Sequence, residues 1–184
     1  MNNKSLYPKR RNLRLPRYDY ASLGAYFVTI CTKDKRFLLG QIVDSRMMQN
    51  RFGEAVASVW KEIPLHYPEI NNEVFIVMPN HVHGIIIIQD IGRAGYKPAP
   101  TKTHSLSEVV RGFKTYSSRR INEIQKSQGK MVRQRSYYEH VIRNEKDYQK
   151  IGEYILFNPS KWETDRNNPD AKLIKPLSAL DISA

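Results

Sequence analysis

The most constraining feature of the sequence is the segment His81–Ile88, which reads HVHGIIII. Side chains alternate between the two faces of a β-strand, so isoleucines fall on both faces of this segment. Both histidines fall on one of them, with only Val82 between them turned to the other side. A strand that is apolar on both faces is typical of the interior of a sheet. The segment therefore predicts a central strand with two imidazoles at its entrance.

The neighbouring segments predict the strands that pair with it. Glu73–Met78 (EVFIVM) reads as a strand, and Pro79-Asn80 supplies a turn, so a hairpin with the histidines just past its bend is expected. The β-branched and aromatic run at 25–32 (AYFVTICT) predicts another strand. A short strand is expected after Gly129, in VRQRSYYEHVI.

Apolar residues at helical spacing predict three helices. They span Asn50–Trp60, Ser105–Ile124, and Glu145 to about Phe157, the last capped by Asn144. The resulting order, βαββαβ followed by a helix, predicts an α+β fold with a ferredoxin-like antiparallel sheet and an added C-terminal helix. We expect three parts: a basic extension (1–24), the folded domain (25–160) and a polar tail (161–184).

The charge of the chain indicates its kind of partner. A formal net charge of +12 favours a polyanion, nucleic acid before membrane. No apolar run approaches the ~20 residues that span a bilayer, and the N-terminus lacks the apolar core of a signal peptide, so a cytoplasmic protein is expected. The single Cys31 is interpreted as a buried small hydrophobe.

Basic side chains gather in two places, the N-terminal extension and the region of the second helix. The candidate DNA contacts are Arg10, Arg11, Arg14, Arg17, Arg111, Lys114, Arg119, Arg120, Arg133, Arg135 and Arg143. The alternative is that these charges are simply solvated.

The histidine pair has a spacing that can close on one metal ion. Two imidazoles need at least one more protein ligand, and they leave positions for water and phosphate oxygens, as a catalytic site requires. The sequence has no cysteine cluster that would make a structural site. The alternative is a pair of hydrogen-bonded polar residues at a strand end.

Five sequence blocks carry a resemblance to a known family: RLPRYDY, GAYFVTICT, MPNHVHGI, YYEHVIRN and DYQKIGEYILFNP. From about Arg14 to Pro159 the chain resembles the REP-associated tyrosine transposases, a branch related to the one-tyrosine transposases of bacterial insertion sequences. The resemblance implies an HUH (His-hydrophobic-His) endonuclease on an RRM-like sheet. Its implied substrates are single-stranded DNA hairpins of repetitive extragenic palindromes.

The resemblance also implies roles for particular residues. Tyr154 occupies the nucleophile position on the last helix, and His81 and His83 occupy the metal-ligand positions. Asn158, one turn beyond the tyrosine, is expected as an oxygen ligand, where some relatives use glutamine; a helix-terminal cap is the alternative. Imidazoles alone would favour zinc, whereas the resemblance favours Mg²⁺ or Mn²⁺. The implied reaction leaves a 5′-phosphotyrosine and a free 3′-hydroxyl, in a monomer or homodimer.

Two other functions are compatible with the sequence. A non-catalytic RRM-like nucleic-acid binder would make the histidine pair incidental, and it predicts no dependence on metal. A replication-initiator or relaxase-like nickase would share the HUH chemistry, but it usually needs further domains.

Overall fold

The computed structural model describes residues 18–72, 74–91 and 104–171 of the 184. Four of the basic residues predicted to contact DNA, Arg10, Arg11, Arg14 and Arg17, lie outside this part of the chain. Residues 172–184 of the predicted tail also lie outside it.

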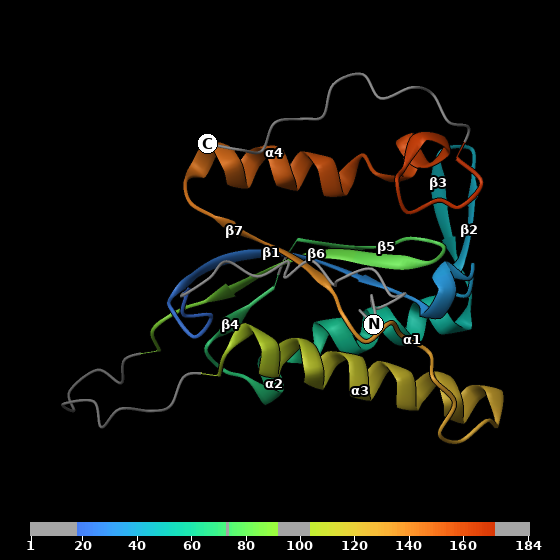
Figure 1. The fold of residues 1–184 in the computed structure, drawn as a ribbon, viewed down its shortest axis with the longest axis horizontal. Helices are drawn as coiled ribbons and strands as arrows, with labels where there is room; N and C mark the ends of the chain where they lie inside the picture. The colour runs from blue at the N-terminus through green and yellow to red at the C-terminus, as the bar shows by residue number, and fades with distance from the viewer. Residues whose placement is uncertain (1–17, 73, 92–103, 172–184) are drawn as a thin grey trace, which may run out of the picture.

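An antiparallel five-stranded sheet forms the centre of the molecule (Figure 1). β1 (Gly24–Cys31) lies between β7 (Tyr138–Ile142) and β6 (His81–Ile88), and two short strands, β4 (Ile70–Asn71) and β5 (Phe75–Val77), pair with the other edge of β6. The predicted central position of the histidine strand is confirmed, and the fold is a mixed α/β one with an antiparallel sheet.

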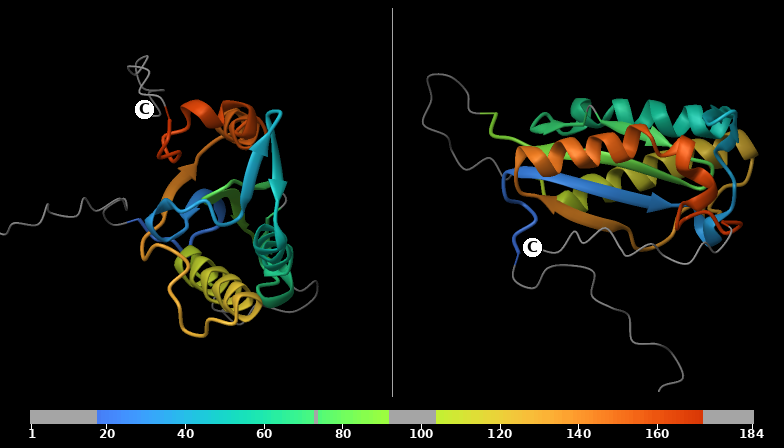
Figure 2. Two further views of the ribbon diagram at one scale, coloured as in Figure 1. Left: turned by 90° about the vertical axis from the view of Figure 1, so that its right-hand side faces the viewer. Right: turned by 90° about the horizontal axis from the view of Figure 1, so that it is seen from above.

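Helices cover both faces of this sheet (Figures 1 and 2). α1 (Arg51–Lys61), α2 (Ile63–His66) and α3 (Leu106–Gln125) lie against one face, and α4 (Glu145–Leu156) lies against the other. Within the described residues no helix has the length and apolar character needed to span a membrane.

The two faces of β6 pack against different helices. Val82 and Ile86 belong to the larger buried cluster, which includes side chains of α1 and α3. Ile85 belongs to a smaller cluster with Ile151 and Ile155 of α4. Because His81 and His83 alternate with the first set, they share the α4 side of the sheet with Ile85. The register of one strand thus places both imidazoles beside the last helix.

Gly84 makes room for the largest side chain of the core. A Cβ atom at Gly84 would lie 2.4 Å from a ring carbon of Trp60. The indole stacks on Phe75 with ring centroids 4.4 Å apart, and its Nε1 donates to the carbonyl oxygen of Asn72. A side chain at position 84 would displace this packing, which explains a glycine inside a central strand.

Side chains cap the three long helices where the sequence predicts their starts. The Asn50 and Asn144 side chains accept hydrogen bonds from backbone N–H groups of the first turns of α1 and α4. Ser105 and Glu108 form a reciprocal capping box at α3. Each cap satisfies N–H groups that have no partner inside the helix, so local sequence fixes these starts.

Several short elements were not predicted. They are the hairpin of β2 (Gly40–Val43) and β3 (Arg46–Gln49), the strand β4, the helix α2, and two 3₁₀ turns, η1 (Lys33–Lys35) and η2 (Pro159–Thr164). Residues 161–167, which we expected to begin a polar tail, continue the fold from η2, and Asp165 and Asn167 are buried.

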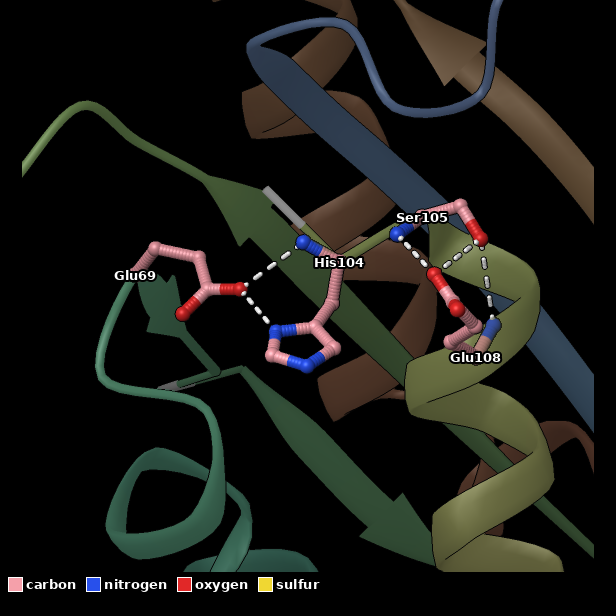
Figure 3. A network of polar contacts seen from close by, with 4 residues as sticks. All are labelled: Glu69, His104, Ser105 and Glu108. Carbon is pink, nitrogen blue, oxygen red and sulfur yellow. Dashed lines mark hydrogen bonds and ion pairs between the residues drawn. The ribbon is translucent and has the colours of Figure 1, made fainter. Parts of the chain in front are cut away.

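A polar network joins the start of α3 to the segment that precedes β4 (Figure 3). The buried Glu69 carboxylate accepts from the backbone N–H of His104 (3.0 Å) and lies 2.6 Å from its Nδ1. Burial acts to raise the pKa of the Glu69 carboxyl, but the bonds from His104 outweigh it, and the pKa falls below its usual value. The charged form of Glu69 is therefore stabilised by folding.

Replacing Glu69 with Gln is expected to destabilise the protein at pH 7 by about 1.5 to 3 kcal/mol, the range for hydrogen bonds to charged groups. Because folding lowers the pKa, this contribution is complete above the unfolded-state pKa and disappears as the pH falls through the folded-state pKa. Urea unfolding of both proteins at neutral and acidic pH measures the difference. Glu123→Gln, which removes an exposed partner of Arg119, is the control. If Glu69→Gln lowers the free energy of unfolding by the same amount at acidic pH as at neutral pH, this explanation is wrong.

Candidate active site

The two histidines of β6 meet through their ring nitrogens. Both side chains are fully buried, and the Nε2 atoms of His81 and His83 lie 2.9 Å apart. Cross-strand pairing aligns Cys31 with His81 and Thr29 with His83, so the end of β1 supplies the neighbours of the pair. The predicted common orientation of the two imidazoles is present in the structure.

Asn80 fixes the tautomer of His81. The Asn80 Nδ2 group donates to the carbonyl oxygens of Lys35 (3.0 Å) and Asn167 (2.7 Å), so this end of the amide is the donor. Its Oδ1 then accepts from Nδ1 of His81 at 2.7 Å. Since Nδ1 carries the proton, Nε2 of His81 presents a lone pair toward His83.

His83 is held by β1. Its Nδ1 lies 2.9 Å from the hydroxyl oxygen of the buried Thr29, and its ring stacks on Phe27 with centroids 5.3 Å apart. Burial lowers the pKa of both imidazoles, that of His81 to about 4; the charge of Asp165 opposes the shift of His81, and the positive charges of nearby groups add to it. Both rings are therefore neutral at pH 7, the form that binds metals.

Asp165 brings a carboxylate to the histidine pair. One of its oxygens and one ring nitrogen from each histidine all lie within 4.8 Å of one another. Asn158 Nδ2 donates to Oδ2 of Asp165 at 3.0 Å, and the backbone N–H of Asn167 donates to Oδ1. Sequence reasoning missed this residue because it lies in a polar stretch without periodicity, where burial leaves no local signal.

Asn158, the predicted oxygen ligand, lies beside this cluster. Its side chain is 1 % exposed and donates to Asp165, and it makes no capping bond to η2. Its Oδ1 atom is buried without a hydrogen-bond partner among the described residues. A buried amide oxygen is costly to leave unpaired, so this atom is suited to accept a ligand.

The Tyr154 hydroxyl reaches the same cluster from α4. It lies 3.4 Å from Nε2 of His83, and the ring packs edge-on against Phe27. Burial raises the pKa of Tyr154 to about 12, with a further contribution from the charge of Asp165; Arg166 and Asn158 act in the opposite direction. The phenol is therefore protonated at neutral pH.

Two cations that sequence reasoning did not single out flank the cluster. The exposed Arg166 guanidinium lies over the ring of Tyr138, 5.0 Å from its centroid, and Lys35 Nζ donates to the carbonyl oxygen of Arg166 at 3.0 Å. The charges of both residues act to lower the pKa of His81. They provide positive potential at the edge of the site, where an anion would enter.

The other predicted DNA contacts do not gather at this cluster. α3, which carries four of them, lies on the opposite face of the sheet (Figure 2). Arg120 forms a two-pronged ion pair with Glu62 (2.7 and 2.9 Å), and Arg119 pairs with Glu123 (3.0 Å). Arg120 thus has a structural role in joining α1 to α3.

The remaining members of the predicted set differ in exposure. Arg111 on α3 and Arg143 before α4 are exposed, whereas Lys114 is half-buried and donates to the carbonyl oxygen of Arg135 at 2.7 Å. Arg135 itself is exposed and Arg133 is buried. Arg111 and Arg143 are thus exposed but lie in different parts of the fold, on α3 and in the turn between β7 and α4.

Two proteins of Haemophilus influenzae are similar to this chain in sequence. No family model matches it. An uncharacterized Haemophilus influenzae protein is 41 % identical over 170 residues, 85 % of this chain and 92 % of that protein, so the two belong to one family. A second protein of this organism, named provisionally as a REP-associated tyrosine transposase, is 26 % identical over 148 residues, 79 % of this chain and 75 % of that protein.

A solved structure shares the fold. It is a REP-associated tyrosine transposase bound to a REP hairpin, and it aligns with a TM-score of 0.54 and 23 % identity over 81 % of this chain and 73 % of that one. The similarity in sequence and the similarity in fold point to the same group of proteins.

Proposed function

We propose that this chain, a relative of the REP-associated tyrosine transposases by sequence and by fold, is a metal-dependent single-stranded DNA endonuclease and transposase. In this proposal it acts in the cytoplasm, as a monomer or homodimer, and cleaves and rejoins DNA at REP-type palindromic hairpins. A ferredoxin-like sheet presents the histidine pair, and α4 carries the nucleophile. The observation that supports the proposal most directly is the contact between the Tyr154 hydroxyl and His83.

The residues of the cluster fit a divalent cation. The Nδ1 atoms of both histidines are held by Asn80 and Thr29, so the Nε2 atoms, which face each other, are the ring atoms that can act as ligands. Asp165 offers a carboxylate oxygen, and Asn158 offers the buried amide oxygen that lacks a partner among the described residues. We propose that these groups hold Mg²⁺ or Mn²⁺, which when bound would polarise the scissile phosphate and stabilise charge on its oxygens.

Tyr154 acts in this proposal as the nucleophile. Its phenolic oxygen forms a bond to phosphorus while the bond from phosphorus to the 3′-oxygen breaks, and the phenolic proton is balanced by the one gained by the released 3′-hydroxyl. The product is a 5′-phosphotyrosine, which conserves the bond energy for rejoining. Burial, and secondarily the charge of Asp165, raise the pKa of Tyr154 and make the phenol a weak nucleophile by itself, so positive charge beside the phenolic oxygen is required at the moment of attack.

The chain offers positive charge for the DNA that surrounds the cut. Arg166 and Lys35 flank the cluster and would contact the phosphates beside the scissile one. The N-terminal extension, with Arg10, Arg11, Arg14 and Arg17, is proposed to hold the hairpin. The solved relative is bound to such a hairpin, and its name supplies the class of substrate for this chain.

A cleavage assay tests this function. A REP-type hairpin oligonucleotide labelled on the 3′ side of the cut is incubated with the protein and Mn²⁺ or Mg²⁺, then separated on a denaturing gel. We expect a shifted band that a protease removes, because the 5′-phosphate becomes linked to tyrosine. The same sequence as a full duplex should give neither the band nor comparable affinity.

Two results would reject the proposal. Hairpin binding without cleavage in any divalent cation would favour a non-catalytic nucleic-acid binder. Equal affinity for hairpin and duplex, with steep weakening by salt, would indicate a nonspecific basic protein.

A further inference from the structure

A second polar site lies on the face of the sheet opposite Tyr154. A groove of about 1100 Å³ runs between one side of α3 and the segment 127–137, which leads from α3 toward β7 (Figure 1). Lys114 lines the groove, and its Nζ donates to the carbonyl oxygen of Arg135 at 2.7 Å. The groove is thus formed by a helix and an irregular segment that a hydrogen bond joins.

The lining of this groove is strongly cationic. Seven of its residues are Lys or Arg and one, Glu123, is acidic. Glu123 is already paired with Arg119 at 3.0 Å, so it leaves the other six cations uncompensated within the lining. Hydroxyl and amide side chains of α3, among them Ser118 and Asn122, also line it. This combination suits an anion with many oxygen atoms.

Arg133 is the most unusual member of the lining. It is 4 % exposed, and its three guanidinium nitrogens are buried without a hydrogen-bond partner in the part of the chain that the structure describes. The Phe113 ring, 5.7 Å from the guanidinium carbon, covers one side of it. Burial lowers the pKa of Arg133 to about 10, so the side chain remains charged at pH 7. A buried, charged fork of donors is costly unless an anion pairs with it.

The repulsion between Arg133 and Lys114 also favours an anion in the groove. Burial lowers the pKa of Lys114, and the positive charge of Arg133 lowers it further. Two cations have therefore been brought together at the groove, and an anion bound between them would relieve both the desolvation and the repulsion.

The groove approaches the catalytic end of the sheet. Arg133 forms a β-bridge with Thr32, and the backbone N–H of Gln134 donates to the carbonyl oxygen of Cys31 at 3.1 Å. Cys31 is the strand partner of His81. The segment that carries Arg133 is thus bonded to the same end of β1 that pairs with the histidine strand.

We propose that Arg133, with the cations beside it, binds backbone phosphates of the DNA substrate in this groove. The guanidinium presents a fixed fork of N–H donors that matches two oxygens of one phosphate, while Lys114 and the exposed cations contact neighbouring phosphates. The choice of DNA as the source of the phosphates rests on the proposed function. The groove would then hold the part of the substrate that is not being cut.

Hairpin binding by Arg133→Met tests this role. Affinity for a fluorescent REP-type hairpin is measured by anisotropy at several salt concentrations, in EDTA and in the Tyr154→Phe background, so that cleavage plays no part. We expect affinity to fall about ten- to hundredfold, and the slope of log K against log salt to decrease by about one, because one phosphate contact is lost. Arg46→Met, which removes an exposed charge outside the groove, is the matched control and should leave affinity nearly unchanged.

Thermal melting separates binding from folding. Without DNA, Arg133→Met should melt at the wild-type temperature or above it, since the variant no longer buries an unpaired charge. A variant that melts normally and binds the hairpin as well as wild type would overturn the proposal. If Arg133→Met does not fold, Arg133→Lys decides: weaker binding, from loss of the two-pronged contact, supports the role, and unchanged binding rejects it.

Inorganic phosphate distinguishes the two sources of the anion. If phosphate raises the melting temperature of wild type but not of Arg133→Met, and hairpin affinity is equal in the two proteins, the groove binds free phosphate and the assignment to DNA is wrong. If Arg133→Met binds the hairpin more weakly but the wild-type protein never cleaves it, the proposed catalysis is wrong and the role of the groove stands.

Discussion

Tyr154→Phe is expected to abolish strand cleavage and the covalent protein–DNA adduct together. The substitution removes only the phenolic oxygen, and loss of a nucleophile lowers rates by about 10⁴-fold or more. The ring that packs edge-on against Phe27 remains, so the fold and hairpin affinity should be preserved. The measurement is the denaturing gel of a hairpin labelled on the 3′ side of the cut, with Mn²⁺ or Mg²⁺.

Tyr148→Phe is the matched control on the same helix. Tyr148 is half-buried and packs against the α4-side core, so its variant should keep cleavage activity. An adduct that persists in Tyr154→Phe but disappears in Tyr137→Phe or Tyr138→Phe would show that another tyrosine is the nucleophile. Because the phenol of Tyr154 has a pKa of about 12, wild-type cleavage should also increase with pH through the neutral range.

His83→Ala and His81→Ala are expected to remove most cleavage, by at least about a hundredfold, because each deletes one of few protein ligands of the proposed cation. Hairpin affinity should remain close to wild type, since phosphate contacts provide most of it. EDTA should have the same effect on the wild-type protein. Titration calorimetry with Mn²⁺ measures the loss of cation binding directly, independently of cleavage.

Asp165→Asn and Asn158→Ala identify the oxygen ligand. Asp165→Asn keeps the shape of the side chain and removes its charge, so weaker Mn²⁺ binding would assign the carboxylate; the same loss in Asn158→Ala alone would assign the amide. His66→Ala, an exposed histidine on α2 whose ring stacks on Tyr116, is the control and should bind Mn²⁺ as wild type does. Cleavage that is insensitive to EDTA and to both β6 histidine substitutions would refute the metal site.

The position of β6 in the fold follows directly from its own sequence. Alternation alone placed His81 and His83 on one face and the strand at the centre of the sheet, because the period of a strand is a local property of the chain. Helix starts at Asn50, Ser105 and Asn144 were predicted equally well, since a cap depends on the three residues that follow it. The role of Tyr154 is implied only by the family resemblance, because helical spacing does not distinguish it from the other tyrosines.

The tertiary structure alone decided the contacts between distant segments. Asp165 reaches the histidines because η2 turns the chain back after α4, and Arg120 binds Glu62 because α1 and α3 pack side by side. Arg133 is buried because the segment after α3 packs its side chain against the helix, with Phe113 on one side of the guanidinium. Periodicity and capping report which face a residue occupies within its own element. The partner on that face, and the burial that sets a charge's pKa, depend on how elements far apart in sequence pack together.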